Sequence, residues 1–94
     1  MSDFNISDDT MVVTSSYVTR EGHPILEVSH EDDEEGGSLW QFHCGNGDYA
    51  IERMELVRFD TVLKMDSTVC AVANLKMGQC ARRSAINASW VIDS

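Results

Sequence analysis

With 94 residues, the chain is long enough for one small domain but too short for two. Its hydrophobic share of 43% excludes an intrinsically disordered chain, despite a net charge of −9. No apolar run approaches the roughly 20 residues needed to cross a bilayer, and the acidic start is unlike a signal peptide, so we expect a soluble, cytoplasmic protein that does not bind membranes.

The negative charge is concentrated in the first third of the chain. Residues 1–35 carry ten acidic residues against Arg20 alone, a net charge of −9, whereas residues 36–94 carry six residues of each sign. Nucleic acid is therefore not an expected ligand, because phosphate groups are bound by basic patches. A concentrated negative field attracts basic proteins instead. We expect a basic protein partner, and the alternative is that the acidity serves solubility only.

The start of the chain predicts an acidic tail followed by two strands. Residues 1–9 hold too few apolar side chains to dock firmly and are expected to form a flexible tail, so that a single domain covers residues 10–94. Residues 10–18 are rich in β-branched side chains, and residues 25–30 alternate between apolar and polar, so both favour strands. Turn residues at 20–24 predict that the two strands form a hairpin.

An acidic segment and a third strand come next. Five consecutive acids predict a surface loop, because like charges repel one another, and they are the candidate partner-binding residues: Glu31, Asp32, Asp33, Glu34 and Glu35. Residues 38–44 predict a strand with Trp40, Phe42 and Cys44 on one face. Gly45 opens a turn after this strand.

From residue 51 onward the hydrophobic period becomes helical. Apolar residues from Leu56 to Leu63 lie at helical spacing, and Asp66 then caps a second short helix. Gly78 ends this unit, residues 79–86 predict a last strand, and residues 90–92 predict an apolar tail on the core. The order indicates an α+β fold with a small antiparallel sheet of three to four strands packed against two short helices. The edges of so small a sheet leave a homodimer open.

No metal, cofactor or catalytic site is predicted. His23, His30, His43 and Cys44 fall in the strand region, but His43 and Cys44 point to opposite faces and match no zinc pattern. The acidic run lacks the alternation and the glycine of a calcium loop. The chain also lacks a Gly-x-Ser-x-Gly elbow and a phosphate-binding loop. A small metal-dependent enzyme, with His30 or His43 beside a cysteine or carboxylate cluster, is the disfavoured alternative.

The cysteines, the tryptophans and two adjacent arginines are assigned to structure. The three cysteines are odd in number and form no C-x-x-C, so they are expected to be reduced packing residues. Trp40 and Trp90 are predicted core residues. Arg82 and Arg83 point to opposite faces of the predicted last strand, so that one can pair with the acidic loop while the other lies against a tryptophan ring.

An ordered series of residues resembles a family of small uncharacterised bacterial domains, some of which are described as polymorphic-toxin immunity proteins. In the first half the series comprises residues 26–30, the acidic loop, Trp40-Gln41-Phe42 and Gly45. In the second half it continues through residues 61–63, Asp66-Ser67, Leu75, Gly78, Ala81, Arg83 and Trp90. It departs from the family at Ser67, Lys76-Met77, Gln79 and Ser84, where prolines, an aromatic and an acid are usual.

The resemblance covers residues 13–90 and implies an α+β domain, and the family has no established catalytic residues to carry over. It also implies an immunity-type role, in which a cytoplasmic protein binds and blocks a toxin. We therefore expect a non-catalytic protein-binding domain. A stand-alone domain with a housekeeping role is the alternative.

Overall fold

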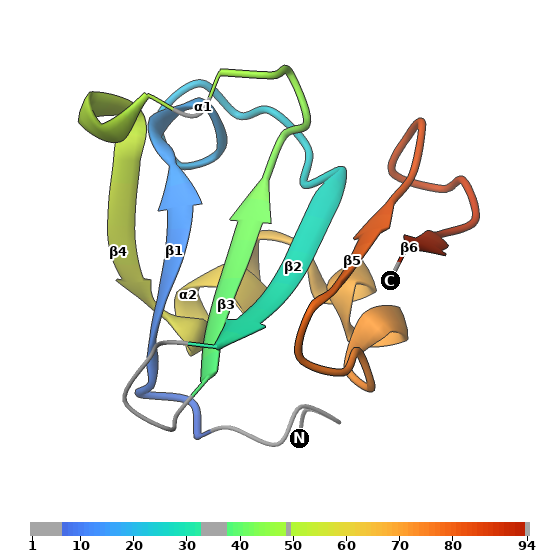
Figure 1. Cartoon of the computed structure of the whole chain (residues 1–94). Coiled ribbons are helices and arrows are strands. Elements are labelled where there is room, and N and C mark those ends of the chain that lie inside the picture. The colour runs from blue at the N-terminus through green and yellow to red at the C-terminus, as the bar shows by residue number, and fades with distance from the viewer. Residues whose placement is uncertain (1–6, 33–37, 49, 94) are drawn as a thin grey trace.

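Six strands form one mixed sheet in the computed structural model, which describes residues 7–32, 38–48 and 50–93. The strands lie in the order β4-β1-β3-β2-β5-β6, and neighbours are antiparallel except for the parallel pair β1 and β3 (Figure 1). Along the chain the elements are β1 (Met11–Ser15), α1 (Ser16–Thr19), β2 (Glu27–Asp32), β3 (Ser38–His43), the 3-10 turn η1 (Ile51–Arg53), β4 (Met54–Arg58), α2 (Phe59–Met65), the 3-10 helix η2 (Ser67–Val72), β5 (Gln79–Arg82) and β6 (Val91–Asp93).

The α+β class and the single unit are confirmed, but the predicted sheet is wrong in size and pairing. The prediction of three to four antiparallel strands missed β4 and β6, and no hairpin joins β1 to β2. The chain leaves the sheet directly after β1 in the helical turn α1, where the amide of His23 donates to the carbonyl of Tyr17. It returns as β2 on the far side of β3, so that β3 occupies the place beside β1.

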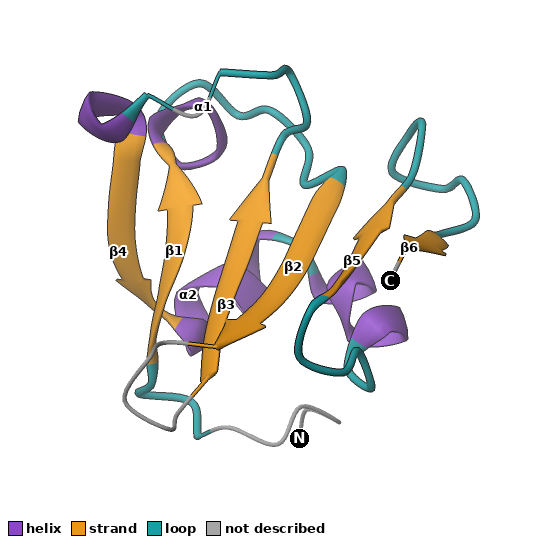
Figure 2. Ribbon diagram, viewed as in Figure 1, coloured by secondary structure: helices purple, strands orange, loops and turns teal. Residues whose placement is uncertain are grey.

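The segments α2 and η2 cover one face of the sheet and leave the other open (Figure 2). The core lies between the covered face and the helical segment, because alternate strand residues point toward the helices. The sheet contributes Val12, Val28, Trp40, Phe42 and Ala81. The helical segment contributes Phe59, Val62, Val69, Val72 and Leu75. Aromatic rings extend through this core, with ring centroids 6.3 Å apart for Trp40 and Phe42 and 6.1 Å apart for Phe42 and Phe59.

The segment predicted as one helix from residue 51 divides into a strand and a helix. Residues 54–58 form β4, which pairs with all of β1, and α2 begins only at Phe59. Leu56 is consequently 65% exposed instead of buried on a helix face. Phe59 and Val62 are fully buried, as the helical spacing predicted. The helical spacing of the apolar residues therefore predicted α2 correctly, but it wrongly predicted a helix for the residues of β4.

The end of the chain adds one more edge strand. The predicted last strand stops at Arg82, and Val91–Asp93 then returns beside it as β6. Val91 and Ile92 are exposed, so residues 91–92 do not tuck onto the core as predicted, whereas Trp90 is half-buried against it. At the other terminus, residues 1–6 of the predicted tail lie outside the described part, and the carbonyl of Asp8 accepts a hydrogen bond from the amide of Asp60.

Candidate functional site

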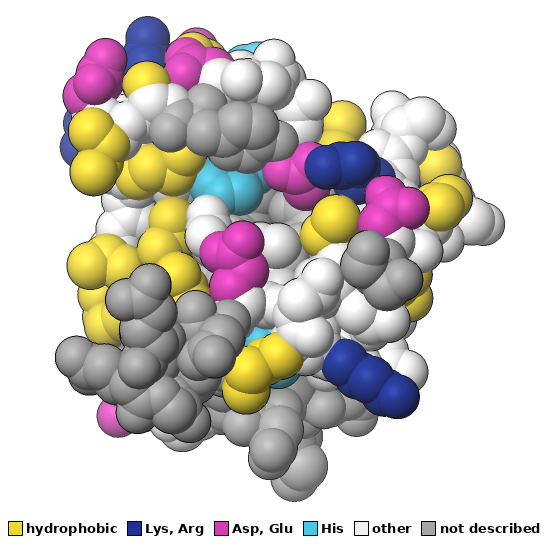
Figure 3. Space-filling model, viewed as in Figure 1, with side chains coloured by type: hydrophobic (Ala, Val, Ile, Leu, Met, Phe, Trp, Pro, Cys, Tyr) yellow, Lys and Arg dark blue, Asp and Glu magenta, His cyan; other side chains and the backbone are white. Residues whose placement is uncertain are grey.

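The open face of the sheet divides into an apolar half and a polar half. One row of paired residues crosses the face from Leu56 on β4 through Val13 on β1 and Gln41 on β3 to Ser29 on β2. In Figure 3, hydrophobic side chains gather over β4 and β1, while acidic and histidine side chains lie nearer the middle of the face. The face therefore offers apolar and hydrogen-bonding surface side by side.

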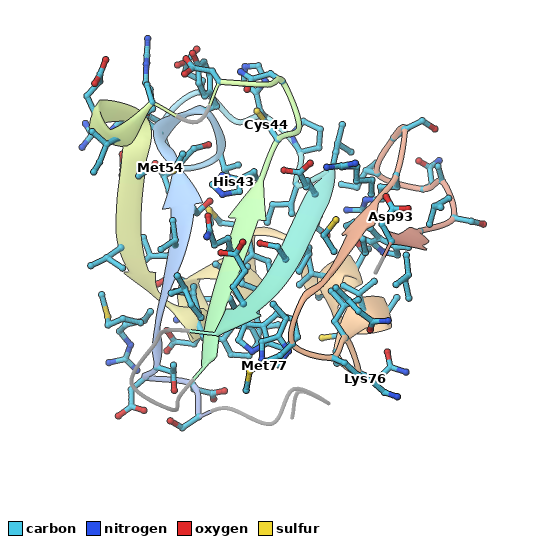
Figure 4. All side chains as sticks on the ribbon, in the orientation of Figure 1. His43, Cys44, Met54, Lys76, Met77 and Asp93 are labelled. Atoms are coloured by element: carbon cyan, nitrogen blue, oxygen red, sulfur yellow. The ribbon has the colours of Figure 1, made fainter. Side chains whose placement is uncertain are left out.

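A hollow of about 610 Å³ lies across this boundary, and we call it the sheet-face hollow. Val13, Ile51 and Met54 form its apolar side. Figure 4 shows Met54 near β4 and His43 on β3 toward the middle of the face. The polar side consists of Glu27, Ser29, Glu31, Gln41, His43, Cys80 and Arg82.

A chain of hydrogen bonds fixes the polar side of the hollow. The Gln41 amide Nε2 donates to Oε2 of Glu31 at 2.5 Å, so its Oε1 is the atom that faces His43. Oε1 of Gln41 lies 2.8 Å from Nε2 of His43, and this contact requires the imidazole to carry its proton on Nε2. Glu31, Gln41 and His43 thus hold one another in defined positions.

The hollow carries a surplus of negative charge. Glu27 is neutralised by Arg82, whose Nε lies 2.7 Å from Oε2 of the carboxylate. Glu31 is exposed and forms no ion pair with a residue that the structure describes. Burial lowers the pKa of His43, and the nearby charges of Glu27 and Glu31 only partly oppose that shift. His43 is therefore neutral near pH 7, and the carboxylate of Glu31 determines the sign of the hollow.

The fold brings two acidic segments to one end of the sheet. The starts of β1 and β3 and the ends of β2 and β4 lie together there (Figure 1). Asp8 and Asp9 precede β1, and Glu31 lies near the end of β2, so we call these three residues the acidic end. The pKa of Arg58 at the end of β4 is raised, chiefly by its hydrogen bond to Asp60 and to a smaller extent by Asp9 and Asp8.

Of the five predicted partner-binding residues, the structure places two. Glu31 lies at the acidic end and also lines the sheet-face hollow. Asp32 is the last residue of β2. Asp33, Glu34 and Glu35 lie outside the described residues.

Every arginine of the chain forms an ion pair with an acidic residue outside the acidic end. The pairs are Arg20–Glu55, Arg53–Glu21, Arg58–Asp60, Arg82–Glu27 and Arg83–Asp66, with N–O distances of 2.7 to 3.5 Å. Two acids of the first third, Glu21 and Glu27, are thus neutralised by arginines of the second part. Asp8, Asp9 and Glu31 form no ion pair with a described residue.

The residues that carry the family resemblance hold the core and its turns. Trp40, Phe42 and Ala81 are buried in the core. Asp66 caps η2, since its carboxylate accepts from the amide of Thr68. Gly45 and Gly78 take φ angles of 74° and 89° at turns, a conformation in which a side chain is strained. None of the residues just named lines the sheet-face hollow, whereas Glu27, Ser29 and Gln41, which belong to the same series, do.

Arg83 and Trp90 complete this structural set. The Arg83 guanidinium donates to Asp66 at 2.8 Å, to the carbonyl of Ile25 at 2.8 and 3.1 Å and to the carbonyl of Ile86 at 2.7 Å. Its carbon Cζ lies 4.2 Å from the centroid of the Trp90 ring. The expectation that one of the two arginines lies against a tryptophan is confirmed. The other, Arg82, pairs with Glu27 and Asp93 among the described residues.

The histidines and cysteines have separate structural surroundings. His30 points to the covered face, where its ring stacks on Trp40 at a centroid distance of 4.1 Å and its Nδ1 lies 2.8 Å from the carbonyl of Leu75. Cys44, Cys70 and Cys80 are free thiols. Within residues 7–32, 38–48 and 50–93, no three His, Cys, Asp or Glu side chains are grouped so that they could hold a metal ion. The described helices are also too short to cross a membrane.

The chain matches no protein-family model, no curated protein and no solved structure. The resemblance to immunity-type domains therefore stays a prediction from the sequence.

The sheet-face hollow itself was missed by the sequence interpretation. Alternation along residues 27–31 and 39–43 does place Glu27, Ser29, Glu31, Gln41 and His43 on one side of their strands. Their assembly with Val13 and Met54 depends on the parallel pairing of β1 with β3 and on the presence of β4, and neither was predicted.

Proposed function

We propose that this chain is a non-catalytic protein-binding domain whose acidic end docks a basic protein. The observation that supports this function best is the position of Asp8, Asp9 and Glu31 at one end of the sheet while every arginine pairs with another acid. Exposed carboxylates of this kind steer a basic partner toward the surface and speed association more than they tighten the complex.

An immunity-type inhibitor is the form of this function that the sequence resemblance favours. In this proposal the partner is a basic, nuclease-type toxin. The carboxylates of the acidic end occupy the toxin's cationic cleft in place of the phosphates of a nucleic-acid substrate. The inhibitor acts in the cytoplasm, where the thiols of Cys44, Cys70 and Cys80 stay reduced. A second copy of the chain is a poorer partner, because two chains of net charge −9 repel each other.

The decisive experiment measures association rates with a partner captured from the source cells. The captured protein is identified, purified and tested against variants at low and high salt. Replacing Asp8 and Asp9, together with Asp32, Asp33, Glu34 and Glu35 of the acidic segment that follows Glu31, by lysine should slow association about tenfold or more at low salt, and salt should reduce this difference. A partner without a basic surface, or an unchanged association rate, contradicts the proposal and favours a role for the acidity in solubility only.

A matched pair of variants separates the acidic end from the total charge. Asp8→Asn together with Asp9→Asn changes the net charge by the same amount as Glu52→Lys. Glu52 is exposed in η1, at the opposite end of the sheet. Slower association for the first variant alone locates the docking surface at the acidic end, whereas equal effects contradict that location.

A further inference from the structure

The sheet-face hollow is suited to a group that is apolar along its length and cationic at its tip. Its apolar side is formed by Val13, Ile51 and Met54, of which Ile51 is 86% exposed. Its polar side presents the carboxylate of Glu31, which Gln41 holds in place at 2.5 Å. A neutral apolar occupant would bury this carboxylate without a counter-charge, which is costly.

The charges around the hollow favour a cation over an anion. Arg82, the cation of the hollow, is engaged with Glu27 at 2.7 Å and with Asp93 at 3.6 Å. His43 contributes no positive charge near pH 7, because its burial favours the neutral imidazole. The remaining charge is the carboxylate of Glu31.

We propose that the sheet-face hollow receives an arginine side chain of the partner, with the methylene groups against Val13 and Met54 and the guanidinium on the carboxylate of Glu31. Arginine fits better than lysine, because its planar fork can donate two hydrogen bonds to one carboxylate and its weakly hydrated head tolerates an apolar wall. Arginine side chains are also frequent among the residues that dominate protein interfaces. This inference rests on the proposed function and adds the residue of the partner that the open face recognises.

The test is a titration of the ¹⁵N-labelled chain with N-acetyl-arginine methylamide, followed by amide chemical shifts. The neutral control probe is the citrulline analogue, which has nearly the same shape and no charge. The arginine probe should shift the amide signals of residues 27–31 and 39–43. The citrulline probe should bind more weakly, by a factor of up to about five, as expected for the loss of a strong exposed ion pair. Equal binding of the two probes, or shifts confined to other residues, overturns the proposal.

Two variants of equal charge locate the binding site. Glu31→Gln should weaken binding of the arginine probe about fivefold, whereas Glu52→Gln, which removes an exposed carboxylate at the opposite end of the sheet, should leave it unchanged. Met54→Ser should also weaken binding, since it removes part of the apolar wall without changing the charge. Equal effects of Glu31→Gln and Glu52→Gln would show a general electrostatic attraction and would overturn the assignment.

Failure of this inference is distinguishable from failure of the proposed function. The docking experiment uses Asp8, Asp9 and residues 32–35; of these, Asp8 and Asp9 have described side chains that do not line the hollow, and Glu31 is left unchanged. A basic partner that binds through the acidic end, but binds Glu31→Gln as tightly as the natural chain, would leave the function standing and remove the hollow from it.

Discussion

Arg82 and Arg83 are neighbours in sequence with opposite environments, because successive strand residues point to opposite faces. The side chain of Arg82 is 60% exposed on the open face, whereas that of Arg83 is 1% exposed beneath the Trp90 ring. Arg83 joins the start of η2 to residues 25 and 86 through Asp66 and two backbone carbonyls. It therefore fixes the position of the segments that close the helical side of the core.

Replacing each arginine by alanine should lower the free energy of unfolding by different amounts in the two environments. Arg83→Ala leaves the buried carboxylate of Asp66 without its cation and should lower the free energy of unfolding by about 3–5 kcal/mol. Arg82→Ala removes an exposed pair and should cost about 1 kcal/mol or less. Urea denaturation followed by circular dichroism measures both. Similar losses for the two variants would contradict the structural role of Arg83.

His43 should make the stability of the protein depend on pH below neutrality. Burial lowers its pKa in the folded state below the ordinary value of 6.5, so in this range the unfolded chain binds more protons than the folded chain. The free energy of unfolding should consequently fall as the pH drops below 6.5. Denaturation at a series of pH values should show this fall in the natural chain and in His23→Gln, in which an exposed histidine is removed. The fall should be smaller in His43→Gln, and an identical pH dependence in both variants would contradict the prediction.

At the scale of single elements, residues 51–65 show why a helical pattern can mislead. Leu56 and Phe59 are three residues apart and suggest one helical face, yet Leu56 belongs to β4 and Phe59 to α2. The five residues of β4 pair with β1, and partners 39 to 47 positions away are not visible in a local period. Tertiary pairing thus overrode the local pattern.

Substitutions on either side of this boundary should have unequal effects. Leu56→Thr exchanges an exposed side chain for a good strand former and should change the free energy of unfolding by about 0.5 kcal/mol or less. Phe59→Ala opens a cavity beside Phe42 and should cost about 3–5 kcal/mol. Chemical denaturation measures both. A loss of several kcal/mol for Leu56→Thr would indicate that residue 56 is buried.

Elements whose signals are local could be predicted from the sequence. The alternation of residues 38–44 gave β3 with its buried face, and Asp66 caps η2 as its side-chain chemistry predicts. The hairpin of the first two strands was wrong, because turn residues at 20–24 reveal a change of direction but not the strand beside which the chain returns. Of the candidate site, the acidity of Glu31 was visible in the sequence, whereas its position near Val13 and Met54 required the strand order.

At the scale of the whole molecule, the acidic end brings negative charges to one side of the fold, and their mutual repulsion lowers the stability of the folded state. Asp8 and Asp9 are adjacent acids before β1, at the end of the sheet where β2 also ends, and neither forms an ion pair with a described arginine, although Arg58 attracts both at longer range. Sodium chloride should therefore raise the thermal midpoint, since the screening length falls from about 10 Å at 0.1 M salt to about 3 Å at 1 M. The double variant Asp8→Asn/Asp9→Asn should have a higher midpoint at low salt and a weaker salt response. A midpoint that does not rise with salt in the natural chain would contradict this expectation.

The first strand of the chain is an interior strand of the sheet, and this order has a consequence for synthesis on the ribosome. β1 is made before both of its neighbours, because its parallel neighbour β3 begins only at Ser38 and its antiparallel neighbour β4 only at Met54. A nascent chain that ends before β4 presents one unsatisfied strand edge on β1, which other chains can pair with. Pairings so distant in sequence also slow folding, to the range of milliseconds to seconds. The N-terminal half therefore has to be kept from association until the polypeptide past Arg58 has emerged.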